Sequence, residues 1–218
     1  MYKTGKKKYD LFKTYYYDDA IKIGKHELPL LKPVKFIPED VISFNEKSRL
    51  KPNDERWIDF FIDDALFECV WNNADKYKRI FKKAKGIITT DYSVYPELHP
   101  DHRSWNITRN RIIAYHLQEH MKLNIVPVAS WCFENDFEWC FDGLPEESSI
   151  AVTSNGCSSS KYAMEIFIKG IEALYEHTKF SNLIVCGRPV KELDIEFKNV
   201  HYYPNFNERL SRRLKNGK

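Results

Sequence analysis

Long apolar segments are missing from this 218-residue chain, and so is the apolar core that a signal peptide carries near its N-terminus. The cysteines number five, an odd count, and no two of them form a Cys-x-x-Cys pair. Irregular cysteine spacing of this kind is typical of reduced intracellular proteins rather than of disulfide-bonded secreted ones. We therefore expect a cytoplasmic protein without a membrane-bound part.

Recognised catalytic and nucleic-acid-binding signatures are absent as well. The chain has no P-loop, no Gly-x-Ser-x-Gly nucleophile elbow and no His-Glu-x-x-His zinc site. It also has no helix-turn-helix, zinc-finger or RNP signature. The net charge is only +3, and basic residues concentrate at the two ends, in Lys6–Lys8 and from Arg209 onward. Such runs either contact phosphates or keep the chain ends solvated.

What the chain does have is a series of apolar strands that end in polar or glycine residues. We expect these strands at residues 57–63, 86–90, 124–130, 149–154 and 182–187, with a last strand at 200–203. Helix-like sequence separates most of them, most clearly at 161–177, where apolar residues recur at periods of three and four. This alternation predicts an α/β domain with a mostly parallel sheet and flanking helices, built either as an open sheet or as an incomplete βα barrel.

The first quarter of the chain differs from the rest. Residues 1–55 contain several prolines, many aromatic residues and little sustained periodicity. They predict an extended N-terminal arm packed on the body, with a short edge strand or turn at 41–45. Because this segment is too short and too proline-broken for a core of its own, we expect a single α/β domain over residues 56–218.

Carboxylates stand directly after two of the expected strands. Asp63 and Asp64 follow the first strand, and Asp91 follows the second. Since the carboxyl ends of parallel strands share one edge of the sheet, these side chains are expected to converge there. All three are candidate ligands for Mg²⁺ or Mn²⁺, and Asp64 and Asp91 are candidate catalytic groups whose pKa a like charge would raise. The alternative is that Asp64 caps a helix and Asp91 caps a turn.

A second group of polar residues lies near the start of a helix expected over residues 103–121. Arg109 offers a planar donor fork suited to phosphate or carboxylate, and it is a candidate catalytic residue. Asn106 and Arg111 are candidate ligand-binding residues on the same helix. Arg109 is expected either to pair with Asp91 or to meet an anionic ligand.

Small residues connect the strand at 149–154 to the clearest helix. Their backbone N–H groups can approach an anion at the helix N-terminus, and Cys157 at this point is a candidate low-pKa thiol. The alternative is a plain capped loop without a ligand. The remaining candidate ligand-binding residues, here and at the ends of other strands, are Trp131, Ser154, Asn155, Gly156 and Arg188.

Several strings agree in order and spacing with one known family. They are Ser43-Phe44-Asn45, Phe60-Phe61-Ile62-Asp63-Asp64, Thr90-Asp91-Tyr92-Ser93, Trp105-Asn106 followed by Arg109-Asn110-Arg111, and Phe141-Asp142-Gly143-Leu144-Pro145. Over roughly residues 30–205 the chain resembles an uncharacterised bacterial and phage family, domain of unknown function four-four-one-seven. The resemblance implies a protein of a phage or mobile element, and it carries no catalytic residue over to this chain.

Three functions are compatible with these features. The first is an enzyme that acts on a phosphate-containing substrate, a nucleotide or nucleic acid, at the carboxyl ends of the strands. The second is a non-catalytic protein that binds a host protein or a small nucleotide. The third is nucleic-acid binding through the basic termini. The sequence favours the first narrowly, because carboxylates, arginines and a small-residue loop are all expected at strand ends.

Overall fold

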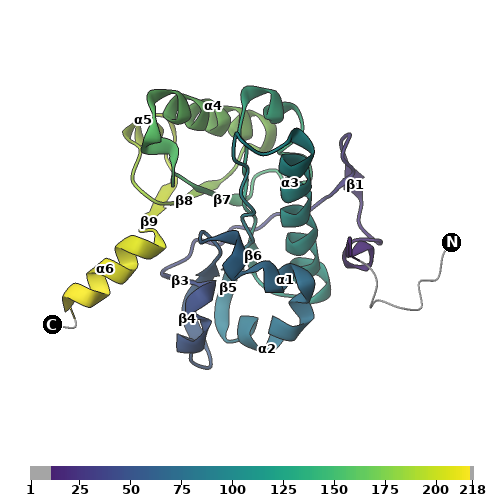
Figure 1. The fold of residues 1–218 in the computed structure, drawn as a ribbon, viewed down its shortest axis with the longest axis vertical. Coiled ribbons are helices and arrows are strands. Elements are labelled where there is room, and N and C mark those ends of the chain that lie inside the picture. Colours follow the sequence, from purple (N-terminus) through teal and green to yellow (C-terminus); the bar gives the residue numbers. More distant parts are fainter. Residues whose placement is uncertain (1–10, 217–218) are drawn as a thin grey trace.

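A computed structural model of the chain describes residues 11–216. Its centre is a parallel β structure whose strands are hydrogen-bonded to one another in chain order (Figure 1). A four-stranded sheet contains β3 (Val41–Ser43), β4 (Asp54–Asp59), β5 (Ala84–Ile88) and β6 (Ile125–Val126). A three-stranded sheet contains β7 (Ser149–Thr153), β8 (Asn182–Cys186) and β9 (Val200–Tyr203). The expected α/β class and the parallel strand direction are therefore confirmed.

The two sheets are continuous and curl back on themselves. A parallel bridge between Val128 and Ala151 joins the end of β6 to β7, and the Ala129 N–H donates to the Ala151 carbonyl at 2.9 Å. At the other end, the Tyr203 hydroxyl of β9 donates to the carbonyl of Pro38, just before β3. No ladder of hydrogen bonds joins β9 to β3 among residues 11–216. Of the two expected architectures, the structure has the incomplete βα barrel.

The inside of this barrel is a small apolar core. One cluster collects a buried side chain from every strand between β3 and β8, with Tyr203 of β9 packed against it. Trp57 of β4 fills much of this space, and its ring lies where a Cβ on Gly86 of β5 would be, at 2.3 Å. Glycine is therefore required in β5, because any larger residue would displace the indole. The core members are Val41, Trp57, Phe61, Ile88, Val126, Val128, Ala151, Ile184 and Cys186.

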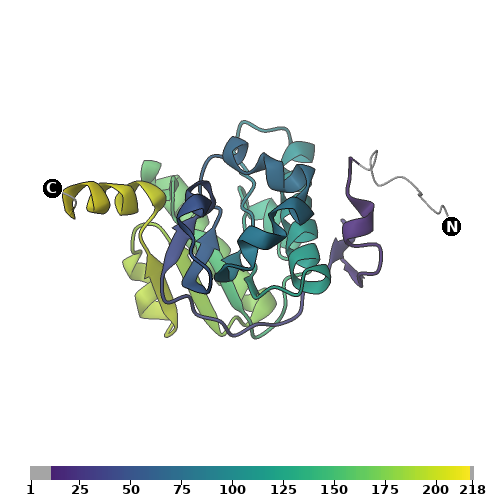
Figure 2. The same cartoon turned by 90° about the horizontal axis from the view of Figure 1, so that it is seen from below.

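Helices cover the outside of the barrel (Figures 1 and 2). Between β4 and β5 the chain forms η4 (Asp64–Leu66), α1 (Glu68–Asn72), η5 (Ala74–Tyr77) and α2 (Lys78–Phe81). Between β5 and β6 lie α3 (Pro100–Tyr115) and a π-helical turn, η6 (His116–His120). Later elements are η7 (Glu134–Glu138), η8 (Cys157–Ser159), α4 (Lys161–Thr178), α5 (Lys191–Glu196) and α6 (Phe206–Asn216).

Local capping explains several of these boundaries. The Asn73 side chain accepts from the Lys76 N–H and separates α1 from η5 in the region between β4 and β5. The His99 side chain accepts from the Asp101 N–H, with Pro100 in the first helical turn, so α3 begins earlier than its periodicity alone indicates. The Ser160 hydroxyl accepts from the Ala163 N–H and starts α4.

The described part of the N-terminal segment packs along the body as a strap. It contains η2 (Thr14–Tyr16) and a hairpin of β1 (Lys22–Ile23) and β2 (Leu28–Pro29). Tyr16 is fully buried, and its ring stacks on His116 of η6 with centroids 3.6 Å apart. The short strand at 41–43 belongs to the barrel, because β3 pairs in parallel with β4. The structure therefore has a strand at the place of the expected edge strand or turn at 41–45, and the sheet begins before residue 56.

Two further expectations concern the ends of the chain and membranes. The basic run Lys6–Lys8 lies outside the described residues. Within residues 11–216, every helix is too short or too polar to cross a lipid bilayer.

Candidate functional site

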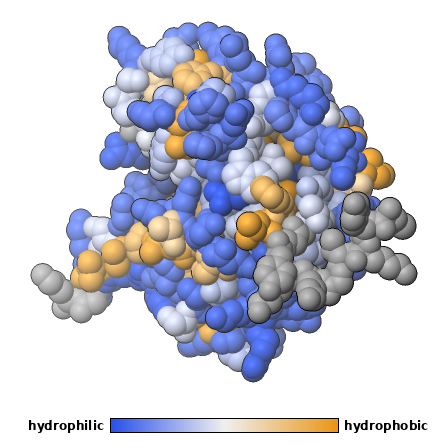
Figure 3. Space-filling view, turned by 45° about the vertical axis from the view of Figure 1, so that its right-hand side comes forward, coloured by the Kyte–Doolittle hydropathy of each residue, from blue (hydrophilic) through white to orange (hydrophobic). Residues whose placement is uncertain are grey.

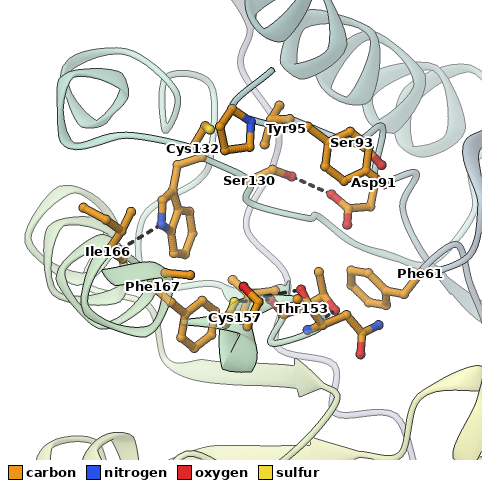
Figure 4. A pocket seen from close by; sticks show the side chains of 18 of the residues that line it. Phe61, Asp91, Ser93, Tyr95, Ser130, Cys132, Thr153, Cys157, Ile166 and Phe167 are labelled. Atoms are coloured by element: carbon orange, nitrogen blue, oxygen red, sulfur yellow. Dashed lines mark hydrogen bonds between the residues drawn. The ribbon is translucent and has the colours of Figure 1, made fainter. Parts of the chain in front are cut away.

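A cavity of about 630 Å³ opens at the carboxyl ends of the middle strands (Figure 4). Phe61 follows β4, Asp91 follows β5 and Thr153 ends β7. Helix α4 closes one wall with Ile166 and Phe167. Ligands of parallel α/β proteins bind at this end of the strands, because the loops that follow the strands converge there. The cavity therefore lies where the strand pattern of the sequence places a site.

Asp91 is the cavity residue with the most unusual environment. Its Oδ1 accepts a hydrogen bond of 2.6 Å from the Ser130 hydroxyl, and its carboxyl points toward the open space in Figure 4. Burial raises the pKa of Asp91 to about 7, and the like charge of Asp64 acts in the same direction, while Ser130 opposes the shift. A carboxyl with a pKa near neutrality can both accept and donate a proton. The sequence identified Asp91 correctly as a strand-end residue, and it missed Ser130.

The other two aspartates are not part of a common ligand set. Asp64 accepts from the Ser93 N–H at 3.1 Å and from the Ser93 hydroxyl at 3.0 Å, and burial raises its pKa. Asp63 lines the cavity but caps η4 by accepting from the Ala65 N–H at 2.9 Å. No group of three or more His, Cys, Asp or Glu side chains within residues 11–216 is arranged to hold a metal ion. Asp63 and Asp91 do line the same cavity, but the expected metal site is wrong, because Asp63, Asp64 and Asp91 accept hydrogen bonds from different groups.

Arg109 has an internal partner that differs from the expected one. Its Nη1 lies 3.0 Å from a carboxylate oxygen of Glu68 on α1, and its Nη2 donates to Asn106 at 2.7 Å. The guanidinium also stacks 3.7 Å from the ring centroid of Tyr92. It does not line the cavity. The expected pairing of Arg109 with Asp91 is wrong, because α1 packs against α3 and places Glu68 next to Arg109.

Asn106 and Arg111 serve the scaffold in this structure. Asn106 donates to the Ser93 carbonyl at 2.6 Å and so holds the loop that follows Asp91. Arg111 is 2% exposed and donates to three backbone carbonyls, those of Val128, Cys140 and Asp142. Burial lowers the pKa of Arg111 to about 10. Its guanidinium is enclosed by protein and does not line the cavity.

Trp131 forms part of the cavity wall, as its place at a strand end suggested. The indole Nε1–H donates to the Ile166 carbonyl at 3.2 Å, and the ring stacks on Phe167 with centroids 5.9 Å apart. A Cβ on Gly170 would lie 2.1 Å from the indole. Glycine at this position in α4 is what allows Trp131 to lie flat against the helix.

The loop after β7 reaches the cavity only in part. Asn155 and Gly156 line it, whereas the Ser154 hydroxyl turns away and donates to the Arg188 carbonyl at 2.9 Å. The Arg188 side chain is exposed and lies outside the lining. Burial raises the pKa of Cys157 to about 11, so this thiol is protonated and the expectation of a low-pKa cysteine is wrong.

The charges of the cavity are of one sign. Its lining contains the acidic residues Asp63, Asp91 and Glu97 and no lysine, arginine or histidine. The nearby cation Arg103 stands behind the lining, with its guanidinium 4.8 Å from the ring centroid of Phe133. The N-terminus of α4, where Tyr162 and Ala163 line the cavity, supplies the positive end of a helix dipole.

Sequence reasoning missed a buried ion pair beside this cavity. Asp59, at the end of β4, is fully buried and accepts from the Ser43 hydroxyl and from Arg209 of α6. Burial raises the pKa of Asp59, and the Arg209 guanidinium works against that shift. The sequence does indicate an unusual carboxylate here, because Asp59 is the one charged residue in the apolar stretch between Trp57 and Ile62. Its partner stands 150 residues later in a basic helix, which no local pattern connects to it.

Comparison with known proteins agrees with the resemblance seen in the sequence. The model of the family described as "Domain of unknown function (DUF4417)" matches residues 21–204. The "Gene 1 protein" of Mycobacterium phage L5 is 27% identical over 186 residues, which cover 84% of this chain and 81% of that protein. The "Gene 1 protein" of Mycobacterium phage D29 is 26% identical over 196 residues, covering 87% and 70%. No solved structure matches. With most of its length inside the family model, the chain belongs to the DUF4417 family, alongside similar proteins of phages.

Proposed function

We propose that this protein binds a small organic molecule in the cavity at the carboxyl ends of β4–β7 and exchanges a proton with it through Asp91. The observation that carries the proposal is the Asp91 carboxyl, which the Ser130 hydroxyl fixes at 2.6 Å and whose pKa is raised to about 7. Raised pKa values at carboxyl groups that face a cavity are typical of general acids and bases. The cavity volume is within the range that holds a small ligand.

Rigid neighbours support this role. Ser130 and Trp131 follow β6, and the Trp131 indole is locked by its hydrogen bond to the Ile166 carbonyl. Asn106 holds the carbonyl of Ser93 two residues after Asp91. A proton-transfer group gains most from such preorganisation, because the cost of orienting it is met when the protein folds.

A phosphate-containing substrate has weaker support. In its favour are the small-residue loop at 154–157 and the N-terminus of α4, both of which border the cavity. Against it stands the absence of any lysine, arginine or histidine from the lining. Arg109 and Arg111, the two arginines that favoured phosphate in the sequence, make their contacts elsewhere. The geometry therefore favours a ligand without phosphate.

Binding of nucleic acid through the C-terminal helix also has less support than its charge suggests. Two of its four basic residues are occupied, because Arg209 pairs with Asp59 and Arg213 pairs with Glu46. What α6 exposes in addition is an apolar stripe that includes Leu210 and Leu214 (Figure 3). The other two basic residues, Arg212 and Lys215, are exposed, and they provide little positive charge for a phosphate-binding surface.

The cavity can be tested with small probes and one blocking substitution. Benzyl alcohol, inorganic phosphate and adenosine monophosphate are titrated into the protein, and binding is followed by nuclear magnetic resonance. Ala163→Phe places a ring in the cavity from α4, whereas Glu172→Phe places the same ring on an exposed position of the same helix. We expect benzyl alcohol to shift the signals of Ser130 and Trp131, and only Ala163→Phe to prevent this.

Two results would overturn the proposal. One is that benzyl alcohol leaves the cavity signals unchanged in the wild-type protein. The other is that phosphate or the nucleotide binds there more tightly than benzyl alcohol, which would restore the phosphate-substrate hypothesis. Unchanged melting temperatures of both variants serve as the folding control.

A further inference from the structure

Aromatic side chains form much of the cavity wall. Phe61 and Phe167 are buried members of the lining, whereas Tyr95 and Tyr162 are each 60% exposed. Large aromatic residues with this much exposure at the rim of a cavity are typical of binding sites, because a ligand can cover them. The aromatic members of the lining are Phe61, Tyr95, Trp131, Phe133, Tyr162 and Phe167.

The polar groups add charge of only one sign to this aromatic wall. Asp91 faces the space directly, and Asp63 and Glu97 border it. The negative faces of aromatic rings attract cations, and a carboxylate in the same cavity strengthens that attraction. An anion would meet three carboxylates without a positively charged side chain in the lining to balance them.

We propose that the natural ligand of this cavity is an organic cation, a small molecule that carries an ammonium group on an apolar or aromatic body. The ammonium group lies against Asp91, and the apolar body lies against Trp131 and Phe167. This inference rests on the proposed function, because it names the class of molecule that the same cavity binds.

The positive charges near the cavity fix the orientation of the ligand. The N-terminal turn of α4, where Tyr162 and Ala163 line the cavity, carries the positive end of the helix dipole and repels a cation. Arg103 is held behind the Phe133 ring, where it donates to the Leu98 carbonyl at 2.6 Å. The ammonium group is therefore expected at the Asp91 end and the uncharged body at the α4 end.

Cation binding and the protonation of Asp91 are linked. The charged or titratable groups that face Asp91 are Asp64 from η4 and Cys186 from β8, with the Ser130 hydroxyl after β6. A cation favours the ionised form of Asp91, so its affinity rises with pH until that carboxyl is fully ionised. A neutral molecule of the same shape lacks this dependence.

The test uses three probes that share a benzene ring and differ in charge: one is a cation, one is neutral and one is an anion. Benzylammonium, benzyl alcohol and benzoate are titrated into the wild-type protein at about pH 8, and binding is measured by calorimetry and by the signals of Ser130 and Trp131. We expect benzylammonium to bind about tenfold more tightly than benzyl alcohol and benzoate to bind least. At about pH 6, where Asp91 is mostly protonated, the preference for the cation should shrink.

Two variants distinguish the effect of the Asp91 charge on binding from the effect of surface charge in general. Asp91→Asn removes the charge with little change of shape, and Asp101→Asn removes a charge from the exposed first turn of α3. We expect Asp91→Asn to make the benzylammonium and benzyl alcohol affinities equal within about twofold. Asp101→Asn should keep the wild-type preference, and both variants should melt cooperatively.

The outcomes distinguish this inference from the function on which it rests. If benzyl alcohol binds in the cavity as tightly as benzylammonium, the organic-cation proposal is overturned and the small-molecule site remains. If benzoate binds most tightly, the ligand is an anion and the proposal is overturned as well. If none of the three probes moves the cavity signals, both proposals fall together.

Discussion

Arg209 of the last helix donates a hydrogen bond of 2.6 Å to Asp59 at the end of the first long strand. The carboxylate is 1% exposed and the guanidinium side chain 12%. This contact, with the ion pair of Arg213 and Glu46, fastens α6 to the barrel next to the gap between β9 and β3. In a closed barrel a ladder of hydrogen bonds would hold β9 to β3. Here the Asp59–Arg209 ion pair stabilises that edge instead.

Removing one partner of that pair should be strongly destabilising. Asp59→Ala leaves the Arg209 guanidinium without its carboxylate in a buried position, which costs about 3–5 kcal/mol of unfolding free energy. The measurement is urea denaturation followed by circular dichroism. Lys169→Ala removes exposed ion pairs with Glu134 and Glu165 and should leave the midpoint unchanged. Equal effects of the two substitutions would contradict the role given to Asp59.

Arg111 should contribute to stability and not to ligand binding. Arg111→Met leaves the carbonyls of Val128, Cys140 and Asp142 without their donors, and we expect a loss of about 3 kcal/mol. Arg188→Met, at an exposed side chain, is the control and should change little. If Arg111→Met kept wild-type stability but abolished binding of benzyl alcohol, the ligand-binding role suggested by the sequence would be correct.

Tyr16 should hold the N-terminal strap to the body through two separable contacts. Tyr16→Phe keeps the stacking on His116 and loses the hydrogen bond from the Ala74 N–H, at a cost of about 1–2 kcal/mol. Tyr16→Ala also loses the buried ring, for a total of about 3–5 kcal/mol. Denaturation midpoints measure both values. Proteolysis within the strap should accelerate in the order wild type, Phe, Ala, and an unchanged rate in the Ala variant would show that the strap is held elsewhere.

Because the pKa of Asp91 is raised in the folded protein, the free energy of unfolding should depend on pH. Between about pH 4 and about pH 7 the unfolded chain has an ionised Asp91 while the folded chain keeps it protonated, so stability falls as pH rises through this window. Asp91→Asn lacks this loss. We expect the variant to exceed the wild type by about 2 kcal/mol above pH 7, roughly half the full value for such a shift because the carboxyl is partly exposed.

Denaturation of wild type and Asp91→Asn at several pH values measures that difference. The two curves should converge toward about pH 4, where Asp91 is protonated in both states. A constant difference across the range would mean that Asp91 has an ordinary pKa and that the substitution acts through packing alone.

The strands and their direction could be predicted from the sequence because burial leaves a local signature. A continuous apolar run such as residues 183–186 indicates a strand that is covered on both faces, and helical periodicity between such runs indicates parallel crossovers. The same reasoning placed Asp91, Trp131 and Asn155 at one end of the sheet, where all three line the cavity. The polarity of the strands was thus enough to predict which end of the sheet carries the cavity.

The partners of the polar residues could not be predicted, since a local pattern does not identify a distant partner. Arg109 pairs with Glu68 rather than Asp91 because of how α1 docks on α3. Arginine is a common anion-binding residue, yet Arg111 donates to backbone carbonyls of the chain between Val128 and Asp142. Asp63 and Asp64 are adjacent in sequence and are held by different groups, which prevents a shared metal site. The barrel shape likewise depends on how close β9 comes to β3, which the sequence of a single strand does not reveal.

The central claim is that the Asp91 carboxyl is poised to exchange a proton with a molecule in the cavity. Its titration can be followed directly through the side-chain carbonyl carbon by nuclear magnetic resonance, with Asp91→Asn to assign the signal. We expect a midpoint of about 7, and a higher midpoint in Ser130→Ala, because the Ser130 hydroxyl stabilises the ionised form. A midpoint near 4, like that of an exposed aspartate, and no change in Ser130→Ala would contradict the account.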